Sequence, residues 1–212
     1  MTSPSSSAAA DHHGTNRAAH PSSSAERILR TALDLFAVKG YDATAVREIC
    51  EAAGITRPTL YHFYGSKEGV LEALVASGFS HFRTMVEGAI SHDGTFRDRV
   101  KLLARAVFDS ATRQPRLWRF IHGFVWAPPA TVRSDRVNCT EFYDGMVRAL
   151  GAAAEEAVRF GELAPGPTGT RMLVLMGALS EAATGYVIAG RPELTPQLAD
   201  QLVDAIFDGW NR

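Results

Sequence analysis

Large apolar residues recur along the chain at intervals of three and four from residue 25 onward. This spacing places apolar side chains on one face of an α-helix, and no segment shows the two-residue alternation of a half-buried β-strand. Glycines, prolines and small polar residues divide the pattern into segments. The sequence therefore predicts an all-α fold of about nine helices, over residues 25–39, 44–54, 56–65, 66–90, 96–113, 116–126, 132–160, 168–189 and 196–210.

The second and third predicted helices are short and are joined by a tight turn at residues 53–55. Thr44, Thr56 and Ser66 each precede an apolar pattern, so each is a predicted N-cap. Two short helices joined in this way match a helix-turn-helix, in which the first helix braces the second and the second enters the major groove of DNA.

The third predicted helix carries side chains suited to DNA. Packing accounts for Ile55, Leu60 and Phe63, which leaves five hydrogen-bond donors to face outward. These five are Thr56, Arg57, Thr59, Tyr61 and His62. No Asp or Glu lies between residues 54 and 67 to repel phosphates. A cation for guanine edges or phosphate, hydroxyls for phosphate and an aromatic ring for a thymine methyl group together favour binding in a DNA groove.

Composition changes this picture only a little. The formal net charge of −1 gives no global attraction to DNA, so a DNA-binding surface must be a local patch. Between residues 24 and 70, six basic residues balance six acidic ones, and this balance confines the positive field to one face. Residues 1–24 are rich in Ser and Ala and are predicted to form a disordered tail.

The sequence also bears on compartment and cofactors. Cys50 and Cys139 are too sparse for a disulfide framework, which favours a reducing cytoplasm. The longest apolar stretch, Met172 to Leu179, is far shorter than the roughly 20 residues that span a bilayer. We therefore expect a cytoplasmic protein with no membrane contact, no cofactor and no metal site.

The N-terminal residues closely resemble the DNA-binding domain of the TetR family of transcriptional regulators. The resemblance covers residues 25–71 and rests on Leu35-Phe36, Lys39-Gly40-Tyr41, Thr44, Val46-Arg47-Glu48-Ile49, Ala52-Ala53-Gly54-Ile55 and Leu60-Tyr61-His62-Phe63-Tyr64-Gly65-Ser66-Lys67-Glu68. It implies a three-helix DNA-binding domain followed, over residues 72–212, by a helical bundle for effector binding and dimerisation. Phe63-Tyr64 departs from the family pattern, which more often has an aromatic with a polar edge followed by Phe.

The resemblance also implies roles for individual residues. Thr44 and Lys67 would contact phosphates, Tyr61 and His62 would contact backbone or base, and Arg57 and Thr59 would be the base readers. Lys67 opposes the dipole at the start of its helix, a small cost that a nearby phosphate would remove. With Thr56, these residues form the predicted DNA-binding set.

Aromatic and sulfur-containing residues are more frequent in the body than a bundle core requires. They predict an apolar pocket between helices for a flat or greasy effector, although each residue alone suits a core equally well. The candidate pocket residues are Phe108, Trp118, Ile121, His122, Phe124, Val125, Phe142, Tyr143, Met146, Met172 and Met176, with His122, Asn138, Thr140 and Tyr143 as polar handles.

The last two predicted helices suggest a dimer. Residues 168–189 are apolar nearly all round, which indicates burial on two sides. With residues 196–210 they would form a four-helix interface between two copies, as the resemblance also implies. The candidate interface residues are Ala178, Ala182, Gly185, Ala189, Leu198, Leu202, Ile206 and Trp210.

These features predict a homodimeric repressor that binds double-stranded operator DNA and releases it when a small, largely apolar effector binds. The fourth helix, which links the two parts, is the expected lever. A ligand-responsive activator and a helical interaction module that does not bind DNA are alternatives. No catalytic motif or cluster of metal ligands occurs, so an enzyme is not expected.

Overall fold

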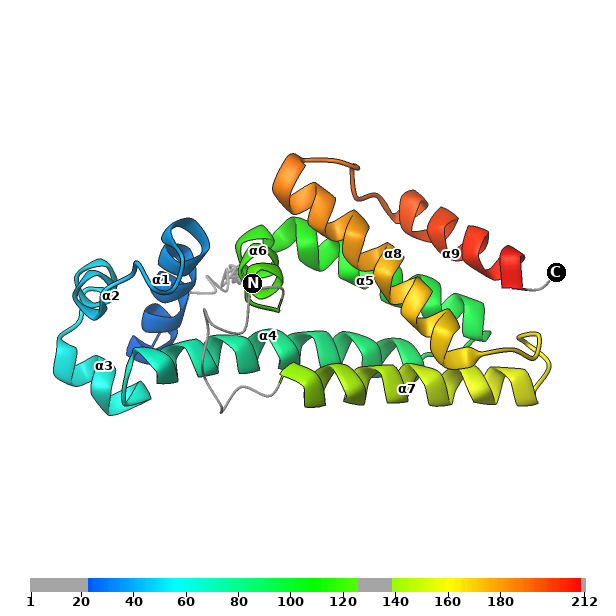
Figure 1. The fold of residues 1–212 in the computed structure, drawn as a ribbon, viewed down its shortest axis with the longest axis horizontal. Helices are drawn as coiled ribbons and strands as arrows, with labels where there is room; N and C mark the ends of the chain where they lie inside the picture. The colour runs from blue at the N-terminus through cyan, green and yellow to red at the C-terminus, as the bar shows by residue number, and fades with distance from the viewer. Residues whose placement is uncertain (1–22, 126–138, 211–212) are drawn as a thin grey trace, which may run out of the picture.

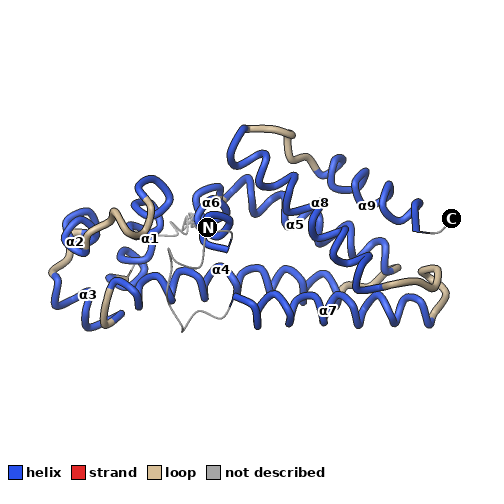
Figure 2. Tube along the Cα trace, in the orientation of Figure 1, coloured by secondary structure: helices blue, strands red, loops and turns tan. Residues whose placement is uncertain are grey.

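The computed structural model describes residues 23–125 and 139–210, and within them it contains nine helices and no strand (Figures 1 and 2). Residues 1–22 of the predicted tail, Trp126 and residues 132–138 lie outside the described residues, whereas Ser23 and Ser24, the last two residues of that tail, are the N-cap and first residue of α1. The helices are α1 (Ser24–Lys39), α2 (Val46–Ala53), α3 (Arg57–Tyr64), α4 (Lys67–Ile90), α5 (Phe96–Arg113), α6 (Pro115–Val125), α7 (Cys139–Arg159), α8 (Thr168–Ala189) and α9 (Pro196–Trp210).

Capping residues define the helix starts, and one of the predicted caps is wrong. Thr56 and Ser66 cap α3 and α4 as expected, since their side chains accept from the N–H groups of Thr59 and Gly69. Thr44 does not cap α2, because its hydroxyl donates to the carbonyl of Gly40 (2.8 Å). The cap residue is Ala45, whose N–H donates to the Glu48 carboxylate (2.9 Å).

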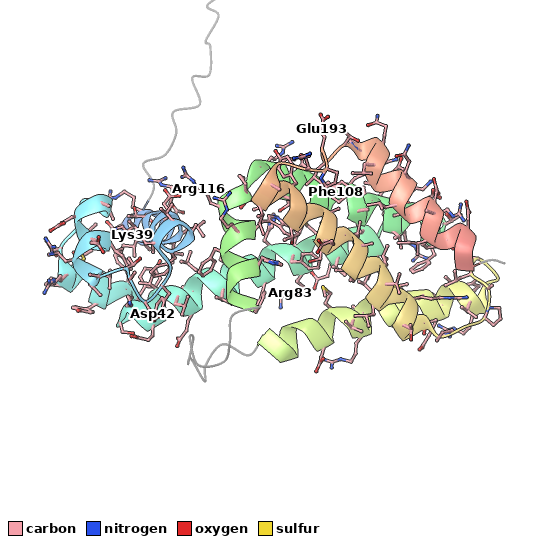
Figure 3. The ribbon with its side chains drawn as sticks, turned by 45° about the horizontal axis from the view of Figure 1, so that its top comes forward. Lys39, Asp42, Arg83, Phe108, Arg116 and Glu193 are labelled. Atoms are coloured by element: carbon pink, nitrogen blue, oxygen red, sulfur yellow. The ribbon has the colours of Figure 1, made fainter. Side chains whose placement is uncertain are left out.

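The buried residues form two hydrophobic clusters, and the side chains between the helices are drawn in Figure 3. The first, which we call the DNA-side core, joins α1, α2, α3, the first turns of α4 and one residue of α6: Ile28, Ala32, Phe36, Ile49, Cys50, Leu60, Val70, Leu71, Leu74, Val75 and Phe120. The second, the body core, joins the rest of α4 with α5, α7, α8 and α9. The long helix α4 therefore contributes to both.

The body core is built around α5 and α8. Helix α9 runs beside α5 (Figure 1), and α8 packs against α5, α6, α7 and α9. By length and composition α8 could also cross a membrane, but these contacts make it the central helix of the body. Ion pairs line the α5–α9 contact, including Arg97 with Asp208 (2.7 Å) and Lys101 with Asp204 (2.7 Å).

Candidate DNA-binding and effector sites

The turn between α2 and α3 has the geometry of a helix-turn-helix. Gly54 adopts a left-handed conformation (φ 61°) that L side chains rarely adopt, and its N–H donates to the carbonyls of Cys50 and Glu51 at the end of α2. The chain then extends through Ile55 to the Thr56 cap of α3. Buried Leu60 anchors α3 on the DNA-side core, so the opposite side of α3 faces solvent.

Four of the five predicted donors on α3 are exposed. Thr56, Arg57 and His62 are exposed, and Tyr61 retains 47% of its accessible surface. Thr59 is half-buried, and its hydroxyl lies 2.9 Å from that of Thr56. Within the described residues Arg57 makes no ion pair, so its charge is available to a ligand.

The apolar Phe63 is exposed and the more polar Tyr64 packs inside, which is the reverse of what their polarity suggests. Phe63 was predicted to pack in the core, and this is wrong: 45% of its surface is exposed. Tyr64 packs against the DNA-side core instead, and its hydroxyl donates to the carbonyl of Ala25 (2.9 Å). Tyr64 lies four residues after Leu60, which places both on the inner face of α3. That spacing was the available signal.

Thr44 is not available to contact phosphate. Its side chain is buried, at 1% exposure, and its hydroxyl is held by Gly40. The implied phosphate contact through this hydroxyl is therefore wrong. The reason is local, because the chain turns back on itself between α1 and α2 and the threonine satisfies a carbonyl at the end of α1.

Lys67 has a structural role that the sequence did not indicate. Its ammonium group donates to the carbonyls of Tyr41 and Thr44 (3.0 Å each) and lies 4.2 Å from the centre of the Tyr41 ring. The Tyr41 hydroxyl donates to Glu68 (2.9 Å), and burial together with this bond raises the pKa of Tyr41. These contacts tie the start of α4 to the α1–α2 turn. An ammonium has three N–H donors, so one remains for phosphate.

A cavity of about 520 Å³ lies in the body, between α4, α5, α6, α7 and α8. Trp118, Ile121, His122, Met146 and Met176 line it, as predicted. Phe108 and Met172 do not, because both are essentially fully buried in the body core. The side chains of Phe124, Val125, Thr140, Phe142 and Tyr143, and the whole of Asn138, were also candidates and lie outside the description.

The contribution of α4 to the cavity was not predicted. Gly78, Phe79, His81, Phe82 and Met85 all line it. A Cβ atom at Gly78 would lie 2.7 Å from Cδ1 of Ile121, so this glycine permits close contact between α4 and α6. The recurring apolar residues of α4 indicated a buried face, but only the packing of α6 and α8 shows which part of that face borders an open space.

Two hydrogen-bonded groups interrupt the apolar wall. The Trp118 indole N–H donates to the hydroxyl of Ser110 (3.0 Å), and the same hydroxyl lies 3.0 Å from Nε2 of His81. Nδ1 of His122 lies 3.2 Å from the hydroxyl of Thr184. We call the first group the Ser110 node. It joins α4, α5 and α6 at the cavity, whereas the second group joins α6 to α8.

Comparison with known proteins agrees with this geometry. The family described as "Bacterial regulatory proteins, tetR family" matches residues 28–74, which form α1 to the first turns of α4. Residues 28–74 therefore form a DNA-binding domain of the TetR family. It is 30% identical over 111 residues to the uncharacterized HTH-type transcriptional regulator YdgC of Bacillus subtilis, an alignment that covers 50% of this chain and 56% of YdgC. The curated relatives are regulators and not enzymes.

Two further matches are informative. The HTH-type transcriptional repressor KstR2 of Mycolicibacterium smegmatis is 40% identical over 55 residues, which are 26% of this chain and 27% of KstR2. The crystal structure of FadR from Bacillus subtilis in complex with stearoyl-CoA superposes with a TM-score of 0.71 at 19% identity, covering 87% of this chain and 98% of FadR. The sequence alignments thus span about half the length of the relatives or less, and the structural likeness shows the fold.

The candidate dimer residues differ in how far they are buried within their own chain. Ala178 is partly buried, and Ala182, Leu198, Leu202 and Ile206 are partly buried against the chain's own body core. Ala189 is exposed, and the Trp210 side chain is not described. Gly185 lies against its own chain, because a Cβ there would lie 2.7 Å from the carbonyl oxygen of Arg191.

The apolar surface of α8 lies mainly at positions that sequence reasoning did not select. Leu173, Val174 and Ile188 are 55%, 51% and 67% exposed. Val174 and Ile188 are two heptads apart and therefore lie on one side of the helix. The sequence indicated an apolar surface on this helix, since residues 168–189 are apolar nearly all round. The predicted interface used its small residues, whereas the exposed apolar surface is formed by larger ones.

Proposed function

We propose that this TetR-family protein is a cytoplasmic, homodimeric repressor that binds operator DNA through α3 and releases it when a small apolar molecule fills the cavity. Residues 25–71 would form the DNA-binding domain and residues 72–212 the effector-binding and dimerisation domain, with α4 continuous across the boundary. The observation that carries this proposal is the position of α6, which contacts both the cavity and the DNA-side core.

One face of α6 borders the cavity through Trp118 and His122, which are four residues apart. Its other face contacts α1. The ring of Phe120 stacks on that of Phe36 at 6.2 Å between centroids, and Arg116 forms an ion pair with Asp34 (2.6 Å). A molecule in the cavity that displaces α6 therefore acts directly on α1, the helix that supports α2 and α3.

Helix α4 supplies a second connection. Its cavity face touches α6 at Gly78, and its first turn is fixed to the α1–α2 turn through Lys67. A ligand that binds better when α4 and α6 are moved apart must weaken operator binding by the same factor, because the coupling free energy between two sites is reciprocal.

The DNA surface consists of the exposed side chains of α3. Arg57 is suited to a guanine edge or a phosphate, Tyr61 and His62 to the sugar-phosphate backbone or a base, and Thr56 to a phosphate. Thr59 remains a candidate base reader from its half-buried position. Lys67 would add a phosphate contact through its remaining donor.

A second copy of the chain is the proposed occupant of the exposed α8 face. Helix-turn-helix proteins commonly dimerise to present two recognition helices about 34 Å apart. Leu173, Val174 and Ile188 would form the centre of an interface completed by α9. Replacing both Val174 and Ile188 by Glu is expected to give a monomer in analytical ultracentrifugation, whereas Val38→Glu, at an exposed position on α1, should leave a dimer.

The relatives support repression and ligand control without establishing either for this chain. KstR2 is named a repressor, and the FadR structure contains stearoyl-CoA. The cavity of this chain lies within the range of about 300–1,000 Å³ typical of small-molecule sites. Its mostly apolar wall favours an apolar effector.

The decisive experiment is a DNA-binding titration by fluorescence anisotropy. Duplexes selected by the wild-type protein from a genomic fragment pool would be titrated at two salt concentrations. Tight, salt-dependent binding that is lost in the Arg57→Ala/Tyr61→Ala variant supports the proposal. The control is Arg83→Ala/Tyr186→Phe, which alters the same residue types on α4 and α8, away from α3.

Failure of the wild type to select any duplex over random DNA would exclude the DNA-binding function and favour an interaction module. Transcription in vitro from a selected promoter gives the sign of regulation. Lower transcript with added protein supports a repressor, and higher transcript identifies an activator.

A further inference from the structure

The described wall of the cavity contains polar side chains but few charged ones. Among the described residues that line it there is no lysine or arginine, and the charged residue is Glu181, which is exposed. Burying a carboxylate or phosphate without a cation costs several kcal/mol. The described wall therefore disfavours an anionic ligand, and its apolar area favours a molecule that is mostly hydrocarbon.

The Ser110 node is the buried polar feature of this wall. Ser110 is 5% exposed and lines the cavity together with its two partners, His81 and Trp118. Its oxygen accepts the indole N–H of Trp118, and the second partner is Nε2 of His81, which donates or accepts according to its tautomer.

This arrangement lets the node meet either kind of uncharged polar group. When Ser110 donates its proton to Nε2 of His81, the hydroxyl oxygen keeps one lone pair to accept a hydrogen bond. When Nε2–H of His81 donates instead, the Ser110 proton is free to donate. The node therefore serves a ligand hydroxyl or a ligand carbonyl, and in neither case does it carry a charge that would pair with an ion.

We infer that the effector is an uncharged, mostly apolar molecule whose hydroxyl or carbonyl group hydrogen-bonds to Ser110 between His81 and Trp118. This inference rests on the proposed function, because it names the chemical class of molecule that acts at the cavity. Ser110 lies on α5 and its partners His81 and Trp118 lie on α4 and α6, so a ligand bound to Ser110 acts through these hydrogen bonds on the two helices that reach the DNA-side core.

The test is calorimetric titration of the full-length protein with molecules that share one body and differ in the head group. A rigid series is naphthalenemethanol, naphthoate, naphthylmethylammonium and methylnaphthalene; a flexible series is decanol, decanoate and decylammonium. In at least one series the alcohol should bind tightest, by about tenfold over either charged form.

Variants then locate the polar contact. Ser110→Ala and Trp118→Phe should each weaken the alcohol by about fivefold and leave methylnaphthalene unchanged if the rigid series binds. Trp118→Phe keeps the aromatic body and so guards against a folding defect in Ser110→Ala. The matched control is Ser80→Ala, an exposed serine beside His81 on α4 that should change nothing.

Three results would overturn the inference: tighter binding of a carboxylate or ammonium than of its alcohol, equal loss of alcohol affinity in Ser80→Ala, or no binding by either series. The operator titration described above is run on the same preparations. Operator binding without alcohol binding rejects the effector class alone, whereas absence of operator binding rejects the proposed function while the calorimetry still reports on the cavity.

Discussion

The two halves of α4 lie in differently packed surroundings. From Val70 to Val75 its inward residues are almost completely buried in the DNA-side core. From Gly78 to Met85 its inward face borders the cavity. A well-packed half resists deformation, whereas a half beside an empty volume is free to move when that volume is filled. In the proposed function, one helix would therefore join a rigid DNA-recognition unit to a deformable sensor.

The largest expected effect tests which residues belong to the packed core and which to the cavity wall. Phe108→Ala should lower the free energy of unfolding by about 3–5 kcal/mol, because Phe108 is fully buried in the body core. Met85→Ala should cost clearly less, because its side chain already borders the cavity. Urea denaturation of both variants measures this, and equal losses would contradict the distinction.

Sequence pattern predicted the helices well because their boundaries are set locally. Thr56 and Ser66 cap α3 and α4, and the positive φ of Gly54 ends α2, so short-range chemistry suffices there. Thr44 shows the limit of that reasoning. Its hydroxyl finds the carbonyl of Gly40 in place of the α2 N–H groups, and both partners are equally local.

The cavity was only partly predictable because it depends on where helices distant in sequence leave space. Phe108 and Trp118 look alike as candidates, yet one fills the body core and the other borders the cavity. To predict the role of α4 in the cavity, one would have to know of the close contact between Gly78 and Ile121. The outward side of α3 was predicted apart from Phe63, which exchanges places with Tyr64.

The next effect tests the connection between the two halves of α4. Gly78→Ala places a Cβ 2.7 Å from Cδ1 of Ile121, so that side chain must shift, and we expect the crowding to press α6 away from α4. We expect operator affinity without effector to fall by about fivefold to tenfold, within the usual range of allosteric coupling. Adding Ile121→Val, which removes Cδ1, should restore most of it in the same anisotropy titration.

Gly88→Ala is the matched control for that prediction, because it lies on the same helix and a Cβ there meets nothing within 4 Å. It should leave operator affinity unchanged and stabilise α4 slightly through the better helix propensity of alanine. A comparable loss of affinity in Gly88→Ala would mean that α4 responds to substitution in general and not to its contact with α6.

A smaller effect tests the DNA-facing side of the rigid unit. Phe63→Ala removes an exposed ring beside Tyr61 and His62 and should weaken operator binding by about fivefold through lost contact with sugar or a thymine methyl group. The free energy of unfolding should change by less than about 0.5 kcal/mol. Val38→Ala, at an exposed apolar residue of α1, should leave DNA affinity unchanged, and a large loss of stability in Phe63→Ala would show that the ring belongs to the core.

The smallest effect concerns the ion pairs between α5 and α9, whose residues lie neither on α3 nor in the cavity wall. The hydrogen bond from Arg105 (2.7 Å) lowers the pKa of Asp200. A carboxyl with a lowered folded-state pKa stabilises the protein above its unfolded value of about 3.9, and this stabilisation is lost as the pH falls through the folded-state pKa. Asp200→Asn should therefore cost about 0.2–1 kcal/mol at neutral pH and nearly nothing in acid, as measured by urea denaturation across pH.

Asp93→Asn, an exposed carboxyl in the α4–α5 loop, removes the same charge and should show no such dependence. A pH-independent cost for Asp200→Asn would mean that this contact stabilises the body through packing and not through charge.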